Sequence, residues 1–173
     1  SNPYSASKAA ADMLIMAWAR TYDLEYLILR PTNNYGIGQY PEKLMPVTVK
    51  LLQRGRKIRL HDAGEPIRNW LHSADTATAV TTIIESGKTN EVYNVAGGFE
   101  QKNKETVRKI VQSYFGDDRD YTPYTNLEHK RPGQDVRYAL DDSKLRGLGW
   151  SPKRAFDTEV SNIVEFYKKN FKW

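Results

Sequence analysis

The pattern of apolar and polar residues alternates along the chain between helical and strand-like segments. Over residues 5–22, apolar side chains such as Met13 and Ala17 recur at three- and four-residue intervals with no Gly or Pro between them, which predicts an amphipathic helix. Further helices are predicted over residues 44–52, 75–85, 103–115, 142–148 and 158–170. Asp75 and Asn103 belong to the residue types that cap helices, so we expect each to begin its helix.

Short apolar runs without a helical period predict the strands. Residues 24–30 and 91–95 are nearly continuous apolar runs, as expected of strands buried on both faces. Shorter strands are predicted over 58–61, 69–72 and 137–140, with a polar loop at 31–36 and loop or extended chain at 121–129. Helix, buried strand and polar loop in succession are typical of an α/β unit, so the fold class is α/β. We find no repeat and no linker, and expect one compact unit.

Composition narrows the classes of function. Of the 173 residues, 39% are hydrophobic and 12% aromatic, which argues against disorder. The chain has no Cys, which excludes disulfides and thiolate metal sites, and no apolar run long enough to span a membrane. We therefore expect a protein of the reducing cytoplasm that binds no membrane. His61, His72 and His129 lack partners at metal-ligand spacing, so no metal site is predicted.

The net charge of +5 could suggest nucleic acid as a partner, but the basic residues are spread among 21 acidic ones. No nucleic-acid partner is therefore expected. The densest basic group is Arg54, Arg56, Lys57 and Arg59. Such a group is either a solvated face or a source of arginines that meet the phosphates of a small ligand. For individual arginines we prefer the second interpretation.

The start of the chain carries its own expectation. No Met precedes Ser1-Asn2, which is either a remnant of tag removal or the native approach to the first helix, so we expect an upstream segment. A dinucleotide-binding loop needs closely spaced glycines between a strand and a helix. The Gly-x-Gly pairs at 36–38 and 147–149 are followed by Pro41 and Pro152, so neither qualifies. An NAD-binding half is thus expected to be absent from this sequence.

The first candidate for chemistry is the spacing Tyr4-x-x-x-Lys8. On a helix, residues four apart lie on the same face. A lysine ammonium beside a phenol lowers the pKa of the phenol, which can then exchange a proton with a substrate hydroxyl. The spacing alone is weak evidence, because an exposed Tyr and Lys fall four apart by chance in many helices. Its context, PYSASKAAAD at residues 3–12, closely resembles the catalytic segment of extended short-chain dehydrogenases/reductases.

The resemblance continues in order over nearly the whole chain. Segment 40–46 (YPEKLMP) is similar to one peculiar to the nucleotide-sugar 4,6-dehydratases of that family. Other matching segments lie at residues 31–36 (PTNNYG), 66–75 (PIRNWLHSAD), 91–98 (EVYNVAGG), 131–138 (RPGQDVRY) and 144–152 (KLRGLGWSP). Each segment is moderate evidence, but their shared order and compatible spacing make the resemblance strong.

The resemblance implies a lyase that uses tightly bound NAD. Tyr4 and Lys8 would be the catalytic residues and would also contact the cofactor, together with Asn34. The parent enzyme would convert a nucleoside-diphosphate glucose, with dTDP-glucose as first choice, to its 4-keto-6-deoxy derivative. The acid and base that eliminate water would lie upstream, so we expect this chain by itself to be inactive.

The substrate contacts implied by the resemblance are Asn33, Lys43, Leu44, Arg59, His61, Arg68, Asn103, Arg131 and Gln134. Arg68 and Arg131 are expected to hold the diphosphate, because the guanidinium fork meets phosphate oxygens bidentately. A surface ion pair is the alternative for each, and helix capping is the alternative for Asn103. His61 and Gln134 stand where the family commonly has Tyr and His, and Lys130 where an Asp is usual. Uridine, cytidine and guanosine diphosphate sugars therefore stay open.

The resemblance also implies how the chain is organised. It would comprise the C-terminal part of a Rossmann-like parallel sheet and a small mixed α/β substrate-binding domain. The cofactor domain would take in residues 1–36 and 70–96, interleaved with the substrate-binding domain at 37–69 and 97–173. A homodimer is expected through helix 5–22. Two alternatives stay open: a sugar-nucleotide 4-epimerase or decarboxylase of the same superfamily, and a non-catalytic sugar-nucleotide binding or dimerisation module.

Overall fold

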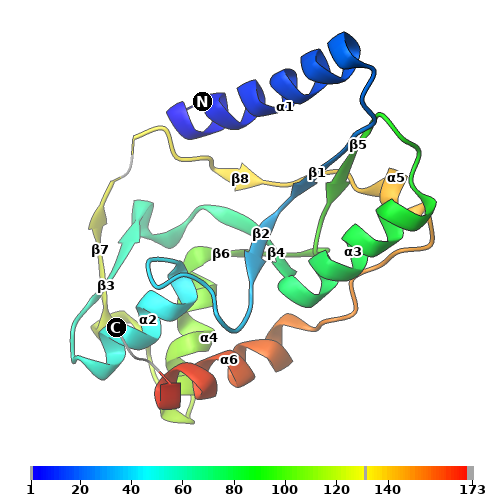
Figure 1. Cartoon of the computed structure of the whole chain (residues 1–173). Coiled ribbons are helices and arrows are strands. Elements are labelled where there is room, and N and C mark those ends of the chain that lie inside the picture. Colours follow the sequence, from blue (N-terminus) through cyan, green and yellow to red (C-terminus); the bar gives the residue numbers. More distant parts are fainter. Residues whose placement is uncertain (1, 131, 171–173) are drawn as a thin grey trace.

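The computed structural model describes residues 2–130 and 132–170, which form an α/β fold (Figure 1). Its helices are α1 (Pro3–Tyr22), α2 (Leu44–Gln53), α3 (Ser73–Ser86), α4 (Asn103–Phe115), α5 (Ser143–Arg146) and α6 (Phe156–Asn170), with short 3-10 turns η1 (Asp62–Gly64) and η2 (Thr122–Tyr124). Its strands are β1 (Leu27–Pro31), β2 (Asn33–Tyr35), β3 (Ile58–His61), β4 (Ile67–His72), β5 (Glu91–Val95), β6 (Phe99–Lys102), β7 (Thr125–His129) and β8 (Arg137–Tyr138). The predicted α/β class is confirmed.

The strands form three small sheets in the part of the chain that is described. β1 pairs in parallel with β5, and β3 pairs in parallel with β7. The third sheet is mixed: β4 pairs in parallel with β2 and β8 and antiparallel with β6. The sheets are parallel or mixed, as expected, but the strands are short and divided among three sheets.

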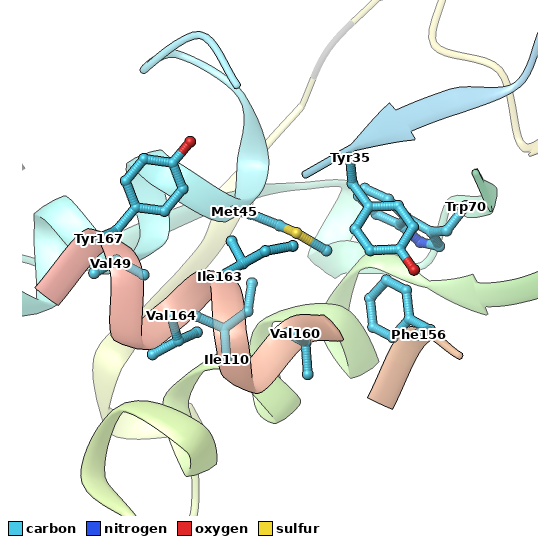
Figure 2. Close-up of a cluster of buried hydrophobic side chains, with 10 residues drawn as sticks. All are labelled: Tyr35, Met45, Val49, Trp70, Ile110, Phe156, Val160, Ile163, Val164 and Tyr167. Atoms are coloured by element: carbon cyan, nitrogen blue, oxygen red, sulfur yellow. The ribbon is translucent and has the colours of Figure 1, made fainter. Parts of the chain in front are cut away.

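The largest core lies where α2, α4 and α6 pack against β2 and β4 (Figures 1 and 2). Its aromatic end joins Tyr35, Trp70 and Phe156, whose rings stand 5.1–6.0 Å apart. Its aliphatic part comes from Met45, Val49, Ile110, Val160, Ile163 and Val164. Burial of each such large side chain contributes about 1.5–3 kcal/mol. This core therefore fixes α6, the last helix, onto β2 and β4.

The turn between β5 and β6 approaches β4 closely. A Cβ atom on Gly97 would lie 1.7 Å from the carbonyl oxygen of Trp70, so only glycine fits there. Asn69 in β4 is buried, and its Oδ1 accepts hydrogen bonds from Gly97 N at 2.8 Å and Thr32 Oγ1 at 3.1 Å. One amide side chain thus joins the end of β1, the mixed sheet and the β5–β6 turn.

Helix α1 differs from the other long helices because it buries none of its side chains. Figure 1 shows it lying along one side of the molecule, away from the main core. Met13, Leu14, Trp18 and Tyr22 are each 56–61% exposed. Among the described residues, no helix is long and apolar enough to cross a membrane. The exposed apolar surface of α1 is larger than that of an ordinary solvated helix face.

Several local predictions were wrong. His72, not Asp75, caps α3: its Nδ1 accepts the N–H of Ala74 at 3.2 Å. Asp75 lies in the first turn, where its buried carboxylate accepts the N–H groups of Lys153 and Arg154 at 3.1 and 3.0 Å. Asn103 is the first residue of α4 rather than its cap, which is Lys102. The capping prediction failed for Asp75 because distant backbone competes for the same side-chain oxygens.

Three strands differ from the predicted pattern. The polar loop at 31–36 contains β2, whose three residues are too short for a recognisable alternation. β6 follows directly after Gly98 although its sequence, FEQK, is mostly polar. The segment 121–129, predicted as loop and extended chain, forms a 3-10 turn followed by the paired strand β7. In each case pairing with a neighbouring strand decides the conformation, as the context dependence of β propensity predicts.

Candidate functional site

The predicted catalytic pair begins helix α1. Asn2 caps the helix, because its Oδ1 accepts the N–H of Ser5 at 2.9 Å, and Pro3 occupies the first turn. Tyr4 and Lys8 follow on one face of the helix, and both are solvent-exposed. Neither side chain forms an ion pair within the described part of the chain. Both groups are therefore accessible to a ligand.

The segment at 132–138 joins the start of α1 to β4. Asn2 Nδ2 donates to the carbonyl of Gly133 at 3.4 Å, while Arg68 Nη1 donates to the carbonyl of Asp135 at 3.0 Å. Arg68 also donates to its neighbouring carbonyl, at Ile67. Gln134 lies between these contacts and is partly exposed. The segment thus brings Gln134 and Arg68 towards the helix end that carries Tyr4.

Arg131, the other arginine predicted to hold the diphosphate, lies outside the described residues. Its proposed convergence with Arg68 stays a prediction. The Arg68 guanidinium donates from Nη1 to two backbone carbonyls, that of Ile67 in β4 and that of Asp135. Those contacts orient a planar group that carries five N–H donors. An oriented fork of this kind suits an anionic ligand.

Asn33 and Asn34 lie on β2, beside Trp70 and Leu71 of β4. The Asn34 side chain is held at both ends: its Nδ2 donates to Thr32 O at 3.1 Å, and its Oδ1 accepts from Thr76 Oγ1. Its backbone carbonyl accepts from Gln39 Nε2 at 2.7 Å. Thr76 and Gln39 were not predicted. Thr76 lies one turn into the helix that follows β4, so only the β2–β4 pairing could have indicated it.

A cavity of about 210 Å³ lies directly beside Asn34. Its lining residues are Asn34, Tyr35, Gly36, Ile37, Gly38, Gln39 and Ser73. The Oε1 of Gln39 is buried there without a hydrogen-bond partner in the described structure. Tyr167 of α6 donates from its hydroxyl to the carbonyl of Gln39 at 3.0 Å. The loop around the cavity is consequently tied to both the strands and the last helix.

A partly buried polar pair, His72 and Glu159, lies close to Tyr35. His72 Nε2 stands 3.8 Å from Glu159 Oε2, and Arg154 Nη1 contacts the same carboxylate at 3.1 Å. Burial raises the pKa of the Tyr35 hydroxyl well above its usual value, and the nearby Glu159 carboxylate raises it further. Tyr35 therefore stays a neutral phenol within the core.

Lys43 and Leu44 lie at the start of α2. Lys43 is the residue before the helix, and its ammonium group contacts Glu42 at 3.0 Å in an exposed ion pair. Leu44 packs partly against two of the hydrophobic cores. Asn103 begins α4, and its N–H donates to the carbonyl of Pro66 at 3.0 Å. Within residues 2–130 and 132–170, no hydrogen bond or ion pair joins these three residues to the start of α1.

Arg59 and His61 lie on the outer face of β3, because the alternating residues Ile58 and Leu60 are buried. The parallel register places Arg59 beside Asn126 and His61 beside His129 on β7. Asn126 and His129 were not predicted as site residues, since no local motif connects them with β3. The structure thus adds two polar side chains to the predicted pair Arg59 and His61.

The described residues contain no group of three or more His, Cys, Asp or Glu side chains that could hold a metal ion. What they offer instead is an exposed phenol and ammonium on α1, an oriented arginine on β4, and amides on β2. This set can bind a polar, anionic molecule and exchange a proton with its hydroxyl group.

Comparison with known proteins connects this arrangement with one family. Residues 1–96 match the model of the family described as "NAD dependent epimerase/dehydratase family". The chain is 38% identical over its full length to dTDP-glucose 4,6-dehydratase 1 of Escherichia coli K12, of which it covers 49%. The chain spans about half the length of the curated relatives that it matches.

Solved structures give the same result. The dTDP-glucose 4,6-dehydratase of Streptomyces venezuelae, with NAD and TYD bound, is 36% identical and superimposes with a TM-score of 0.88 over 97% of this chain and 51% of its own. The UDP-glucose 4-epimerase of Thermotoga maritima, with UDP-glucose, is 26% identical with a TM-score of 0.84, over 98% of this chain and 54% of its own. The predicted resemblance to nucleotide-sugar 4,6-dehydratases is thereby confirmed.

Proposed function

Because this chain belongs to the NAD dependent epimerase/dehydratase family, we propose that it supplies the substrate-binding part of an NAD-dependent nucleotide-sugar 4,6-dehydratase. The reaction would convert a nucleoside-diphosphate glucose, with dTDP-glucose as first choice, to its 4-keto-6-deoxy derivative. The identity of 38%, over the whole of this chain, to a curated dTDP-glucose 4,6-dehydratase carries this proposal. Activity is proposed for the whole enzyme, because the chain covers about half of such relatives.

Tyr4 is proposed as the base that removes the proton from the sugar C4 hydroxyl. Its exposure at the start of α1 lets a ligand reach the phenol oxygen. Lys8, one helical turn further on, stabilises the phenolate by its positive charge and donates a hydrogen bond to the cofactor ribose. Bound NAD would supply the hydride acceptor at C4 and return the hydride at C6.

Asn34 fits a role beside the nicotinamide. Two of its polar groups are committed to Thr32 and Thr76, which fixes the orientation of the amide. The second N–H of that amide and the adjoining cavity can serve a ligand. Residues 1–36 and 70–96 are therefore proposed as the cofactor side, and residues 37–69 and 97–173 as the substrate side.

Arg68 and Arg131 are proposed to grip the diphosphate, with Gln134 beside them. Asn33, Lys43, Leu44, Arg59, His61 and Asn103 complete the proposed substrate contacts. The contact between Arg68 and the carbonyl of Asp135 supports this arrangement, because it holds Arg68 against residues that follow Arg131 closely in the sequence. Helix α1 is proposed as the contact between two subunits, since none of its apolar side chains is buried within the described chain.

A titration of the purified chain with dTDP-glucose, with and without NAD, tests this function. We expect saturable binding of the sugar nucleotide and no 4-keto sugar from the chain alone, as followed by proton NMR. Failure of the sugar nucleotide to bind contradicts the proposal. Turnover by the chain with NAD would instead place the whole catalytic apparatus within these residues.

A 4-epimerase is the second candidate, because the Thermotoga maritima epimerase superimposes nearly as well. Its lower identity of 26%, against 36% for the Streptomyces venezuelae dehydratase, makes it the weaker one. The product distinguishes the two: an epimerase returns a C4-inverted sugar nucleotide that keeps its C6 hydroxyl, whereas a dehydratase releases water.

A further inference from the structure

Helix α1 meets the rest of the described chain through very few contacts. Within residues 2–130 and 132–170 it buries none of its side chains and adds none to the three hydrophobic cores. Its start is tied by the hydrogen bond from Asn2 Nδ2 to the carbonyl of Gly133 at 3.4 Å, and its end continues directly into the chain before β1. Apolar packing therefore does not determine where this helix lies.

One ion pair holds the middle of α1 against β1. Arg30, in β1, donates from Nε to Asp12 Oδ2 at 2.8 Å, and its Nη2 lies 2.6 Å from the same oxygen. The Asp12 side chain is only 20% exposed, so solvent screens this pair weakly. In the described part of the chain, no other ion pair or side-chain hydrogen bond joins residues 3–22 to the strands and helices that follow. The pair thus supplies the one polar contact that sets the helix on the strand, through two charge-assisted bonds.

Asp12 extends a stripe of polar side chains along α1. Tyr4, Lys8 and Asp12 follow at intervals of four residues, so each lies one turn beyond the last on the same side of the helix. At this spacing the Asp12 carboxylate is within reach of the Lys8 ammonium. The carboxylate is bound to Arg30 instead, and Lys8 has no ion pair among the described residues. Arg30 thus engages the carboxylate that would otherwise draw Lys8 away from Tyr4.

The same arginine lies close to the polar residues of β2. In the parallel register of β1 with β5, Arg30 is the partner of Asn94, which fixes its backbone. β2, which carries Asn34, begins shortly after the end of β1. The ion pair therefore connects the helix that carries Tyr4 and Lys8 with the strands that lead to Asn34.

We propose that Arg30 and Asp12 are positioning residues for the proposed base. Their ion pair sets α1 on β1, so that Tyr4 meets the sugar hydroxyl from a fixed direction, and it leaves the Lys8 ammonium free to act on Tyr4. Neither Arg30 nor Asp12 has to touch the ligand for this role. The inference rests on the proposed function for the roles of Tyr4 and Lys8, whereas the placement of the helix can be measured without any ligand.

Distances between spin labels measure the placement of α1 directly. The chain has no Cys, so Ser7→Cys on α1 and Glu85→Cys on α3, both at exposed positions, give one defined pair of labels. In pulsed electron spin resonance of labelled chain diluted with unlabelled chain, we expect the distance distribution to broaden in Arg30→Ala and in Asp12→Ala. Exchange of the two charges, Asp12→Arg together with Arg30→Asp, should narrow the distribution again.

Two controls separate the placement of the helix from a loss of the fold. Arg108→Ala removes an exposed ion pair with Glu105 that stays within α4, and should leave the distribution unchanged. A second label pair, Glu85→Cys with Asp118→Cys, joins two exposed positions outside α1 and should keep its distance in every variant. A distribution that is unchanged in both single alanine variants of the ion pair, or equal broadening for the second label pair, overturns the inference.

Ligand affinity tests whether this placement matters for Tyr4. Both dTDP-glucose and dTDP carry a diphosphate, but only dTDP-glucose has the sugar hydroxyl, so the ratio of the two affinities reports on the contact with the sugar. We expect Arg30→Ala to shift this ratio against dTDP-glucose, in the same direction as Tyr4→Phe. Arg30→Lys, which keeps the charge and loses the fork, should lie between Arg30→Ala and wild type.

The outcomes separate this inference from the function on which it rests. A ratio that changes in Tyr4→Phe but not in Arg30→Ala overturns the positioning role and leaves the proposed function intact. A chain that binds neither ligand contradicts the proposed function, while the label distances still decide whether the ion pair places α1. Circular dichroism of each variant checks that the fold is unchanged.

Discussion

At the scale of single residues, the left-handed turn after β3 concentrates both strain and charge. Ala63 adopts φ 52° and ψ 19°, a conformation that an L-residue with a Cβ disfavours. Glu65, immediately after the turn, contacts two lysines from β6 and α4. A destabilising backbone conformation and a stabilising pair of lysine contacts therefore lie within four residues, Asp62 to Glu65. Single substitutions can separate their contributions to the free energy of unfolding.

Replacement of Ala63 by Gly should stabilise the fold. The left-handed cost of about 1–2 kcal/mol is removed, while the added freedom of the unfolded chain takes back about 0.4–1 kcal/mol. We expect a net gain of about 0.5–1 kcal/mol in the free energy of unfolding, measured by urea denaturation. Ala77→Gly, on the exposed side of α3, is the matched control and should lose about 1 kcal/mol. A loss of stability in both variants would show that Ala63 is not strained.

Glu65 should make stability depend on pH in the acid range. Its hydrogen bonds to Lys102 and Lys104 lower its pKa from 4.5 to about 2. A carboxylate whose pKa is lower in the folded than in the unfolded chain stabilises the fold at pH values above its unfolded pKa. This contribution is lost as the pH falls from 4.5 through 2. Wild type should therefore exceed Glu65→Gln in urea midpoint at pH 6, with the difference shrinking towards pH 2. Glu85→Gln, an exposed change on α3, serves as control. A difference that stays constant with pH would contradict the ion-paired geometry.

At the scale of elements, helix α6 is fixed by groups far away in the sequence. The Asp75 carboxylate accepts two backbone N–H groups just before α6, at Lys153 and Arg154. Phe156, the first residue of the helix, then enters the aromatic core beside Tyr35 and Trp70 (Figure 2). Helix α3 and helix α6 are consequently coupled through one buried side chain.

Asp75→Ala should loosen α6 more than it affects α3. Loss of hydrogen bonds to a charged group predicts a cost of about 1.5–3 kcal/mol in the free energy of unfolding. Hydrogen exchange should become faster at 156–170, while the His72 cap preserves the start of α3. Asp157→Ala removes an exposed ion pair with Lys109 and should cost less than about 1 kcal/mol. If exchange rose mainly in α3, the sequence-based assignment of Asp75 as its cap would have been the better one.

The contrast between Asp75 and α1 shows what the sequence could predict. The helical period over 5–22 predicted α1 within two residues at its start, because the signal is local and uninterrupted. The partners of Asp75 lie 78 and 79 residues away, so no local pattern indicates them. The same limit applies to the site: motifs indicated Tyr4, Lys8 and Asn34, whereas Thr76 depends on the pairing of β2 with β4.

At the scale of the whole molecule, α1 presents apolar surface on more than one side. Leu14 and Trp18 are 61% and 56% exposed, and Ile15, one position around the helix, is 43% exposed. A cavity of about 290 Å³ lies between this helix and residues 24–26, just before β1. Contiguous apolar surface of this kind is typical of contacts between proteins. We therefore expect the chain to self-associate through α1, as in the proposed dimer.

Leu14→Glu should therefore weaken self-association of the chain. A charge in the centre of an apolar contact predicts a loss of roughly tenfold or more in the dimerisation constant, measured by sedimentation equilibrium. Ile84→Glu is the control, because Ile84 is 69% exposed on α3 and lies outside the proposed contact. A wild-type chain that stays monomeric at high concentration, or equal effects of both substitutions, would refute the role of α1.

Sugar-nucleotide binding by Arg68 variants tests the central proposal most directly. Arg68→Ala should weaken binding of dTDP-glucose to the chain by about 1.5–3 kcal/mol, the range for hydrogen bonds to charged groups. Arg68→Lys should recover only part, because the charge remains and the fork is lost. Arg131→Ala should reproduce the loss of Arg68→Ala. Unchanged affinity in both alanine variants, with only the melting temperature lowered, would show that these arginines support the fold and hold no diphosphate.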